Sequence, residues 1–303
     1  MEYKYSLIFI PDKPRKVFVQ KKGLLQLLPF SSIIDHDEQK CGSKNSHLII
    51  STMCLFAMVM YSFGSQAMFV MDNHRSAAWC WLQACHPEQE YNFMHIDRHY
   101  DLLDCFEDRD LQPLFSNSKI PFADFCNLSR SDGEFRVFRW DNYIMASSII
   151  NPGWFHTNIF LTHKEGDKEC SWGHKSLMIR EEDPLSIEWC MQQFIGEPSR
   201  DLDGFEGEDY RNSWIVNLDL DFFFSGNSHI QLFSDDLIRQ IAEILQRNLS
   251  NIAVLTIALS PDCLGGKDHK ERWEKGFRIL RIMSERIECL RLFSDDVKRT
   301  IQV

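Results

Sequence analysis

The sequence lacks an excess of positive charge. Its 303 residues include 33 Lys and Arg against 44 Asp and Glu, which gives a formal net charge of −11 at pH 7. Proteins that bind nucleic acids need clustered cations to neutralise phosphates, so this balance argues against a nucleic-acid partner. An acidic surface favours solubility and is also compatible with a cationic substrate.

The ten cysteines include no CxxC pair and show no regular spacing. This excludes the usual patterns of a zinc ribbon or a disulfide framework. Thiols scattered from Cys41 to Cys289 are typical of a reducing cytoplasm, where they act as small buried apolar side chains. The first residues, MEYKYSLIFIPDKPRK, show no apolar segment before a small-residue cleavage site. We therefore expect a cytoplasmic protein without a signal peptide.

One long segment, residues 48–71, carries no formal charge. Its length could cross a bilayer. However, several polar residues interrupt it, and Gly64 and Ser65 are typical of a turn. We interpret the segment as a buried helix followed by a buried strand, and expect no membrane partner.

Elsewhere, short apolar runs alternate with segments of helical periodicity, and no internal repeat is visible. Strands are expected at 67–71, 91–96, 214–220 and 252–259, and helices at 74–85, 235–246 and 271–290, with Ser234 as a helix cap. The alternation predicts an α/β fold, a three-layer doubly wound, mostly parallel sheet with helices on both faces. We expect a single domain over residues 1–303, with residues 1–47 as a variable N-terminal extension.

The motif HIDRHYD, residues 95–101, follows the second expected strand and alternates His and Asp. In an extended segment, alternate side chains share one face, so His95, Asp97, His99 and Asp101 would converge. A solvated loop has no reason to alternate these residues four times. Chance alternation at a polar strand end is the alternative.

Two further segments carry acids or imidazoles at strand ends. NLDLD places Asp219 and Asp221 on one face of an apolar strand, which is costly unless a cation compensates the carboxylates. This DxD alone would also suit a nucleotide-sugar transferase. In MDNHR, His74 lies at a strand-to-helix junction, where a single His would usually be only a cap. Ligands of doubly wound sheets bind beyond the carboxyl ends of the strands, which is where all three segments lie.

Taken together, the three segments resemble the arginase, or ureohydrolase, superfamily. Its members place a His after a first strand, D-x-H-x-D after a second, and D-x-D after a later one. The resemblance extends in sparse motifs from His74 to about Gly266 and implies an arginase/deacetylase-like fold. The matching positions here are His74, Asp97, His99, Asp101, Asp219 and Asp221.

This resemblance implies a centre that holds two Mn²⁺ ions. One ion would be held by His74, Asp97, Asp101 and Asp219, and the other by Asp97, His99, Asp219 and Asp221. Asp97 and Asp219 would bridge the ions. Carboxylates with a minority of imidazoles suit Mn²⁺ better than a thiolate-preferring metal.

Arginase chemistry would then need groups beyond the metal ligands. Asp221 could accept a hydrogen bond from the attacking hydroxide. A carboxylate must hold the guanidinium, and Asp262 in SPDCLGG is the nearest acid after the last expected strand, although it could equally be a turn residue. The candidates for the proton donor are His156, His163, Asp141 and Asn142.

The sequence departs from enzymes that act on free arginine. Met71, Asp72 and Asn73 replace a Gly-Gly-Asp, and Asp101 is followed by apolar residues instead of polar contacts for the α-groups. The combination DNHRSAAW, HIDRHYD, NLDLDFF and SPDxxGG is similar to a divergent branch that includes peptide arginases. The resemblance implies an arginine-containing precursor peptide as partner, with peptidyl-ornithine and urea as products. Many relatives assemble, so it also allows a homo-oligomer.

Three other functions remain open from the sequence. A zinc deacetylase on the same fold would use one Asp-x-His pair and a later Asp. A DxD glycosyltransferase would use Asp219 and Asp221 but would leave HIDRHYD without a role. A non-catalytic metal-binding protein would keep the ligands without turnover.

Overall fold

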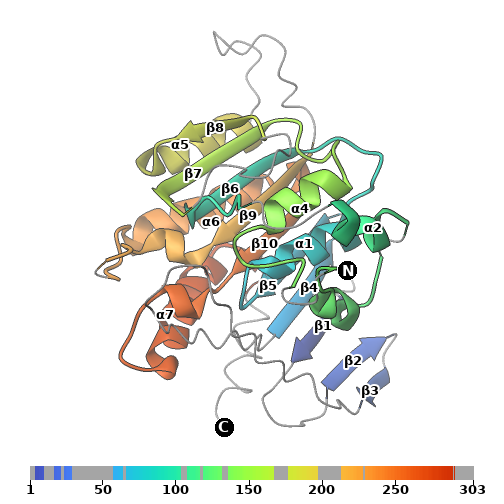
Figure 1. Cartoon of the computed structure of the whole chain (residues 1–303). Coiled ribbons are helices and arrows are strands. Elements are labelled where there is room, and N and C mark those ends of the chain that lie inside the picture. Colours follow the sequence, from blue (N-terminus) through green and yellow to red (C-terminus); the bar gives the residue numbers. More distant parts are fainter. Residues whose placement is uncertain are drawn as a thin grey trace, which may run out of the picture.

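In the computed structural model, the described residues are 4–9, 17–21, 24–28, 57–63, 66–103, 108–116, 119–131, 136–166, 177–196, 213–227, 229–288 and 290. They form one eight-stranded sheet in the order β1-β4-β5-β10-β9-β6-β7-β8 and a separate β2-β3 pair (Figure 1). The strands are β1 Lys4–Phe9, β2 Val17–Lys21, β3 Leu24–Leu28, β4 Ala57–Phe63, β5 Gln66–Met71, β6 Asn92–His99, β7 Asn158–Glu165, β8 Ile179–Glu182, β9 Trp214–Asp219 and β10 Ile252–Ala258.

Six strands of this sheet, from β5 through β10, β9, β6 and β7 to β8, run parallel. Only β1 and β4 at one edge are antiparallel to their neighbours. The expected α/β fold with a mostly parallel sheet is therefore confirmed. Within it, β9 is fully buried along its length, which explains its apolar sequence WIVNLD.

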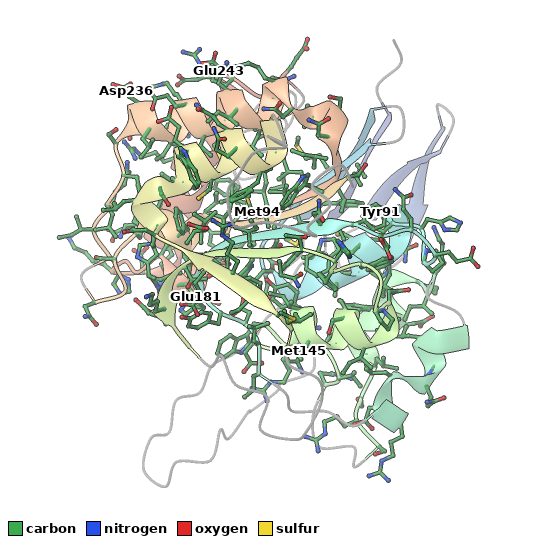
Figure 2. All side chains as sticks on the ribbon, turned by 90° about the horizontal axis from the view of Figure 1, so that it is seen from above. Tyr91, Met94, Met145, Glu181, Asp236 and Glu243 are labelled. Carbon is green, nitrogen blue, oxygen red and sulfur yellow. The ribbon has the colours of Figure 1, made fainter. Side chains whose placement is uncertain are left out.

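Helices cover both faces of the sheet. They are α1 Arg75–Ala84, α2 Asp108–Ser116, α3 Phe122–Asn127, α4 Tyr143–Ile150, α5 Ile187–Cys190, α6 Asp235–Arg247 and α7 His269–Ser284. Alternate residues of β5 enter two different cores: Met68 and Val70 pack with α5, α6 and α7, and Phe69 and Met71 pack with α1 to α4. Figure 2 shows the same layering, with α6 above the sheet and Met145 of α4 below it.

The apolar segment at residues 48–71 differs from the expectation. Its described part forms two antiparallel strands, β4 and β5, with Phe63 opposite Gln66. The helix expected before the second strand is wrong for residues 57–63, and residues 48–56 lie outside the described residues. A continuous apolar run has no periodicity that separates a helix from a strand, so pairing with a neighbour decides. None of the helices in the described ranges is both long and apolar enough to cross a membrane.

The chain reverses direction across the sheet between β6 and β9. From β6 it proceeds outward through β7 to β8, and it then returns to β9 on the other side of β6 before continuing to β10. The carboxyl ends of the adjacent strands β6 and β9 therefore diverge into loops that leave in opposite directions. This switch point is where doubly wound sheets bind ligands.

Candidate metal centre

Three carboxyl-terminal strand ends bring six acids and imidazoles together. His74 immediately precedes α1 after β5. Asp97 and His99 end β6, with Asp101 just beyond it. Asp219 ends β9, and Asp221 lies in the 3-10 turn η3, Leu220–Phe223. All are buried except His99, whose side chain is 17% exposed, so solvent reaches the site on the His99 side.

Two groups of these side chains could each hold a metal ion. The first contains His74, Asp97 and Asp101, and the second contains Asp97, His99 and Asp221. Within each group, the ligand atoms lie within 4.8 Å of one another. Asp97 belongs to both groups, as expected of a carboxylate that bridges two ions. Asp219 belongs to neither group; its Oδ2 contacts His74 Nδ1 and accepts a hydrogen bond from Ser260, and its bridging of two ions stays a prediction.

The contacts inside each group are between imidazole nitrogens and carboxylate oxygens. In the first, His74 Nδ1 is 3.5 Å from Asp97 Oδ2, and His74 Nε2 is 3.5 Å from Asp101 Oδ2. In the second, His99 Nδ1 is 3.2 Å from both Asp97 Oδ1 and Asp221 Oδ2. Each imidazole therefore lies between two carboxylates, which are ligands that a divalent ion could share.

The backbone around the centre uses conformations that most residues avoid. Asp101 has φ 54°, so it leaves the strand in the left-handed region instead of continuing the alternation of β6. Ser260, after β10, has φ 38° and donates a hydrogen bond to Asp219. Left-handed conformations cost roughly 1–2 kcal/mol for residues other than Gly and concentrate at functional sites.

Burial and mutual repulsion shift the ionisation of the carboxylates. Burial, together with Asp219 and Asp97, raises the pKa of Asp221 to about 7. Burial also raises the pKa of Asp101 well above its usual range. Burial alone would raise the pKa of Asp97, but the neighbouring imidazoles of His74 and His99 outweigh it and hold that pKa well below its usual range.

The two imidazoles respond in the opposite sense. Burial would lower the pKa of each, but the carboxylates outweigh it. Asp101 and Asp219 raise the pKa of His74 well above its usual range. Asp221 and Asp97 raise the pKa of His99 to about 11. Without metal, the protons on these imidazoles neutralise part of the charge that cations would otherwise neutralise.

The residues present fit a pair of divalent ions. Among the six residues of the centre, three acids each have one buried oxygen without a hydrogen-bond partner: Asp97 Oδ2, Asp101 Oδ2 and Asp221 Oδ2. A buried carboxylate oxygen without a donor is costly, and a metal ion would satisfy it. Carboxylates with two imidazoles and no thiolate form a donor set that suits Mn²⁺ and similar ions.

His95, the first member of the alternating motif, has a different position. Its Nε2 is 3.1 Å from the His99 carbonyl oxygen, and its Nδ1 is 3.1 Å from Asn217 Nδ2. Nε2 therefore donates and Nδ1 accepts, which requires a neutral ring. Burial lowers the pKa of His95 to about 4, in agreement with that assignment.

Asn217 extends this buried network toward the first group of ligands. Its amide donates to Tyr143 Oη at 2.9 Å and accepts from Thr256 Oγ1 at 2.7 Å. The Tyr143 ring in turn stacks on His74, with ring centroids 5.3 Å apart. An uncharged hydrogen-bond network therefore holds Tyr143, whose ring packs against the face of the His74 imidazole.

Replacing Asn217 by Leu should lower the free energy of unfolding by about 3 kcal/mol, because three buried polar groups would lose a partner. Urea denaturation measures this. Asn251→Leu is the control: that half-buried amide makes one hydrogen bond, to the Ile195 carbonyl, and its loss should cost about 1 kcal/mol. Equal losses in the free energy of unfolding for Asn217→Leu and Asn251→Leu would contradict the stabilising role of the buried hydrogen-bond network around Asn217.

The residues predicted to bind the guanidinium or to transfer the proton have their own contacts in the structure. Asp262 lies in the turn after β10, but its side chain is 63% exposed and 3.6 Å from Arg272. His163 on β7 packs against Phe222, with ring centroids 5.1 Å apart, and its Nε2 is buried without a hydrogen-bond partner among the described residues. Asp141 pairs with Arg139 at 2.7 Å.

His156 and Asn142 are not brought to the centre. His156 precedes β7, and its backbone N–H bonds to the Tyr91 carbonyl at the start of β6, so it lies at the opposite end of the strands. Its ring is 4.0 Å from Glu90. The Asn142 side chain is occupied by the backbone of Arg139 and Val137.

Two charged residues at the centre were not singled out from the sequence. Arg98 lies inside HIDRHYD, and Glu165 ends β7. The available signal for Arg98 was a cation within a strand that is otherwise expected to be buried. Glu165 lies two residues after the segment NIFLTH, residues 158–163. The apolar centre of that segment would have indicated a strand with Glu165 near its carboxyl end.

Comparisons with known proteins give a likeness to solved structures. No protein-family model matches the sequence, and no curated protein sequence is significantly similar to it. Among solved structures, a crystal structure of Helicobacter pylori arginase is similar over 71% of this chain and 70% of that chain, with 13% identity and a TM-score of 0.36. A likeness of this size does not assign the chain to a family.

Proposed function

We propose that this protein is a binuclear manganese hydrolase that cleaves the guanidinium of arginine side chains in a ribosomal peptide to give ornithine and urea. The observation that carries the proposal is the pair of acid–imidazole groups that share Asp97 at the switch point of the sheet. A group of three ligands would suffice for one ion, and the shared carboxylate is what favours two.

The chemistry that such a pair of ions supplies is a hydroxide nucleophile at neutral pH. Asp221 would hold and orient that nucleophile through a hydrogen bond. Asp262 would bind the substrate guanidinium after leaving Arg272, since it lies in the turn that follows β10. Proton transfer to the leaving amine is assigned to His163, which packs beside η3, whereas His156 lies at the other end of the strands.

The residues directly after the DxD support a peptide substrate. Phe222 and Phe223, next to Asp221, are fully buried and offer no polar group to an α-carboxylate. A guanidinium on a peptide side chain needs no such contact. The net charge of −11 is also compatible with a cationic peptide.

The assay uses purified protein, Mn²⁺ and Arg-containing peptides. Turnover should reduce the peptide mass by CH2N2 for each converted arginine and release urea, which mass spectrometry and a colorimetric urea assay detect. The most informative substrate is an arginine-containing precursor peptide that is encoded next to this protein and co-expressed with it. Two Mn²⁺ per chain without any mass change or urea would contradict the proposed reaction.

The alternative functions predict other outcomes. One zinc ion per chain and loss of acetyl groups from acetyl-lysine peptides would indicate a deacetylase. A DxD glycosyltransferase would retain activity after Asp97→Ala. The contact between His99 and Asp221 opposes the glycosyltransferase, because it joins HIDRHYD to the DxD in one group.

A further inference from the structure

Arg98 connects the elements that surround the second group of ligands, Asp97, His99 and Asp221. Its side chain is 6% exposed, and a buried guanidinium requires several compensating contacts. On the β9 side, its Nη2 is 3.6 Å from Asp221 Oδ2, and its backbone N–H bonds to Asp221 Oδ1 at 3.4 Å. On the β10 side, its Nη1 donates to the Cys263 carbonyl at 3.3 Å.

The same guanidinium also contacts β7 and the adjacent ligand. Arg98 Nε is 3.2 Å from Glu165 Oε2, an ion pair without hydrogen-bond geometry. Arg98 Nη2 is 3.5 Å from His99 Nε2, and Glu165 Oε2 is 3.8 Å from the same nitrogen. Since His99 Nδ1 points to Asp97 and Asp221, Arg98 and Glu165 lie on the ring edge that faces away from the ion position.

We propose that Arg98 and Glu165 form a positioning pair for the second ion alone, a role that rests on the proposed binuclear centre. Glu165 lies within ion-pair distance of the outer nitrogen of His99 and so favours a proton on that nitrogen, which leaves Nδ1 for an ion. Arg98 keeps Glu165 and the Asp221 carboxylate in place. Partners that orient ligands typically change metal affinity by about 10–100-fold when they are lost.

The first group has a different kind of support, which makes the effect selective. His74 is backed by Tyr143 and by the neutral network of Asn217 and His95, all of them buried. Neither Arg98 nor Glu165 contacts His74 or Asp101 in the interactions between these described residues. Loss of the pair should therefore leave the first ion bound.

Gly226 provides a variant that moves Glu165 without changing any charge. A Cβ at Gly226 would overlap the carboxylate oxygens of Glu165, whereas the Gly226 backbone itself does not require glycine. Glu165 is 42% exposed and can swing toward solvent, so Gly226→Ala should fold and displace the carboxylate from His99.

The experiment is a Mn²⁺ titration of metal-free protein by isothermal titration calorimetry, with metal content measured after gel filtration. The wild type should bind two ions. Arg98→Met, Glu165→Gln and Gly226→Ala should each weaken the second ion by about 10–100-fold and leave the first within about twofold. Arg180→Met, which removes a partly buried Arg–Glu pair on β8, is the control and should bind both ions normally.

The outcomes separate this inference from the proposed function. Two ions bound with unchanged affinities in Glu165→Gln and Gly226→Ala would overturn the inference and leave the binuclear centre intact. Equal weakening of both ions would also overturn it. A wild type that binds fewer than two ions would overturn the centre itself. Glu165→Gln and Gly226→Ala keep the test decisive if Arg98→Met does not fold.

Discussion

Replacing Asp97 by Asn should reduce peptide hydrolysis by at least about 10³-fold and remove both ions. Asp97 is the carboxylate common to the two groups of ligands, so its loss affects both positions at once. Metal ions contribute several kcal/mol to such reactions, and each 1.36 kcal/mol corresponds to a factor of ten in rate. Urea release and metal analysis measure the two effects on the same sample.

The substitution should not unfold the protein. Asparagine at this position keeps an acceptor for the His99 backbone N–H but removes the charge that pairs with His74 and His99 in the metal-free protein. We therefore expect the metal-free variant to fold, with a melting temperature somewhat below that of the metal-free wild type. Asp110→Asn is a matched control, because Asp110 is also buried but accepts a hydrogen bond from the Ser131 backbone N–H, away from the centre. Normal turnover in Asp97→Asn would exclude the proposed centre.

Addition of Mn²⁺ to the metal-free protein should raise its melting temperature by about 10 °C. An ion present at 100 times its dissociation constant stabilises the folded state by about 2.7 kcal/mol, and two ions contribute about twice that amount. For a chain of this size, 1 kcal/mol corresponds to roughly 2 °C or slightly less. Differential scanning calorimetry with and without Mn²⁺ measures the change, and Mg²⁺ tests how selective it is.

This stabilisation should be larger at pH 8 than at pH 6, and the ionisation of Asp221 contributes to this difference. Its pKa in the folded protein, about 7, lies above the ordinary value of 3.8. Such a carboxyl stabilises the fold fully below pH 3.8, and that contribution is lost as the pH rises through about 7. The metal-free protein therefore becomes less stable from pH 6 to pH 8, by about 1 kcal/mol.

Bound metal ions reverse this trend. They bind the deprotonated Asp221 carboxylate, which is more abundant at pH 8, and they neutralise its charge. His99 changes stability in the same direction, because its pKa of about 11 lies above the ordinary value of 6.5, so only the unfolded chain loses this proton between pH 6 and pH 8. The shift in melting temperature caused by Mn²⁺ should thus increase by at least about 3 °C between pH 6 and pH 8. An identical shift at both pH values would show that Asp221 does not bind the ion.

Much of the fold was accessible from periodicity. The strands at β5, β6, β9 and β10 and the helices α1, α6 and α7 lie close to their expected positions. The Ser234 cap accepts from the Leu237 backbone N–H, as its position before an amphipathic helix indicated. Strand β4 was not identified, because a uniformly apolar run is compatible with both states until it finds a partner.

The sequence by itself determined which side chains could share a cation. His74, Asp97, His99, Asp101, Asp219 and Asp221 are acids and imidazoles at the ends of apolar strands, and parallel strands end at one edge of a sheet. That rule predicts that the three segments meet, but it does not separate His95 from the other residues, because all four residues of the motif alternate in the same way. The choice of these six residues came from the resemblance to the arginase superfamily.

Only the tertiary structure decided how these side chains are supported. His95 contacts Asn217, 122 residues away, and Arg98 contacts Asp221 and Cys263, 123 and 165 residues away. Such contacts depend on strand order and register, which place distant segments side by side and which no local pattern encodes. The sequence therefore predicts the ligands, and the packing of β6 between β7 and β9 determines which neighbours contact each of them.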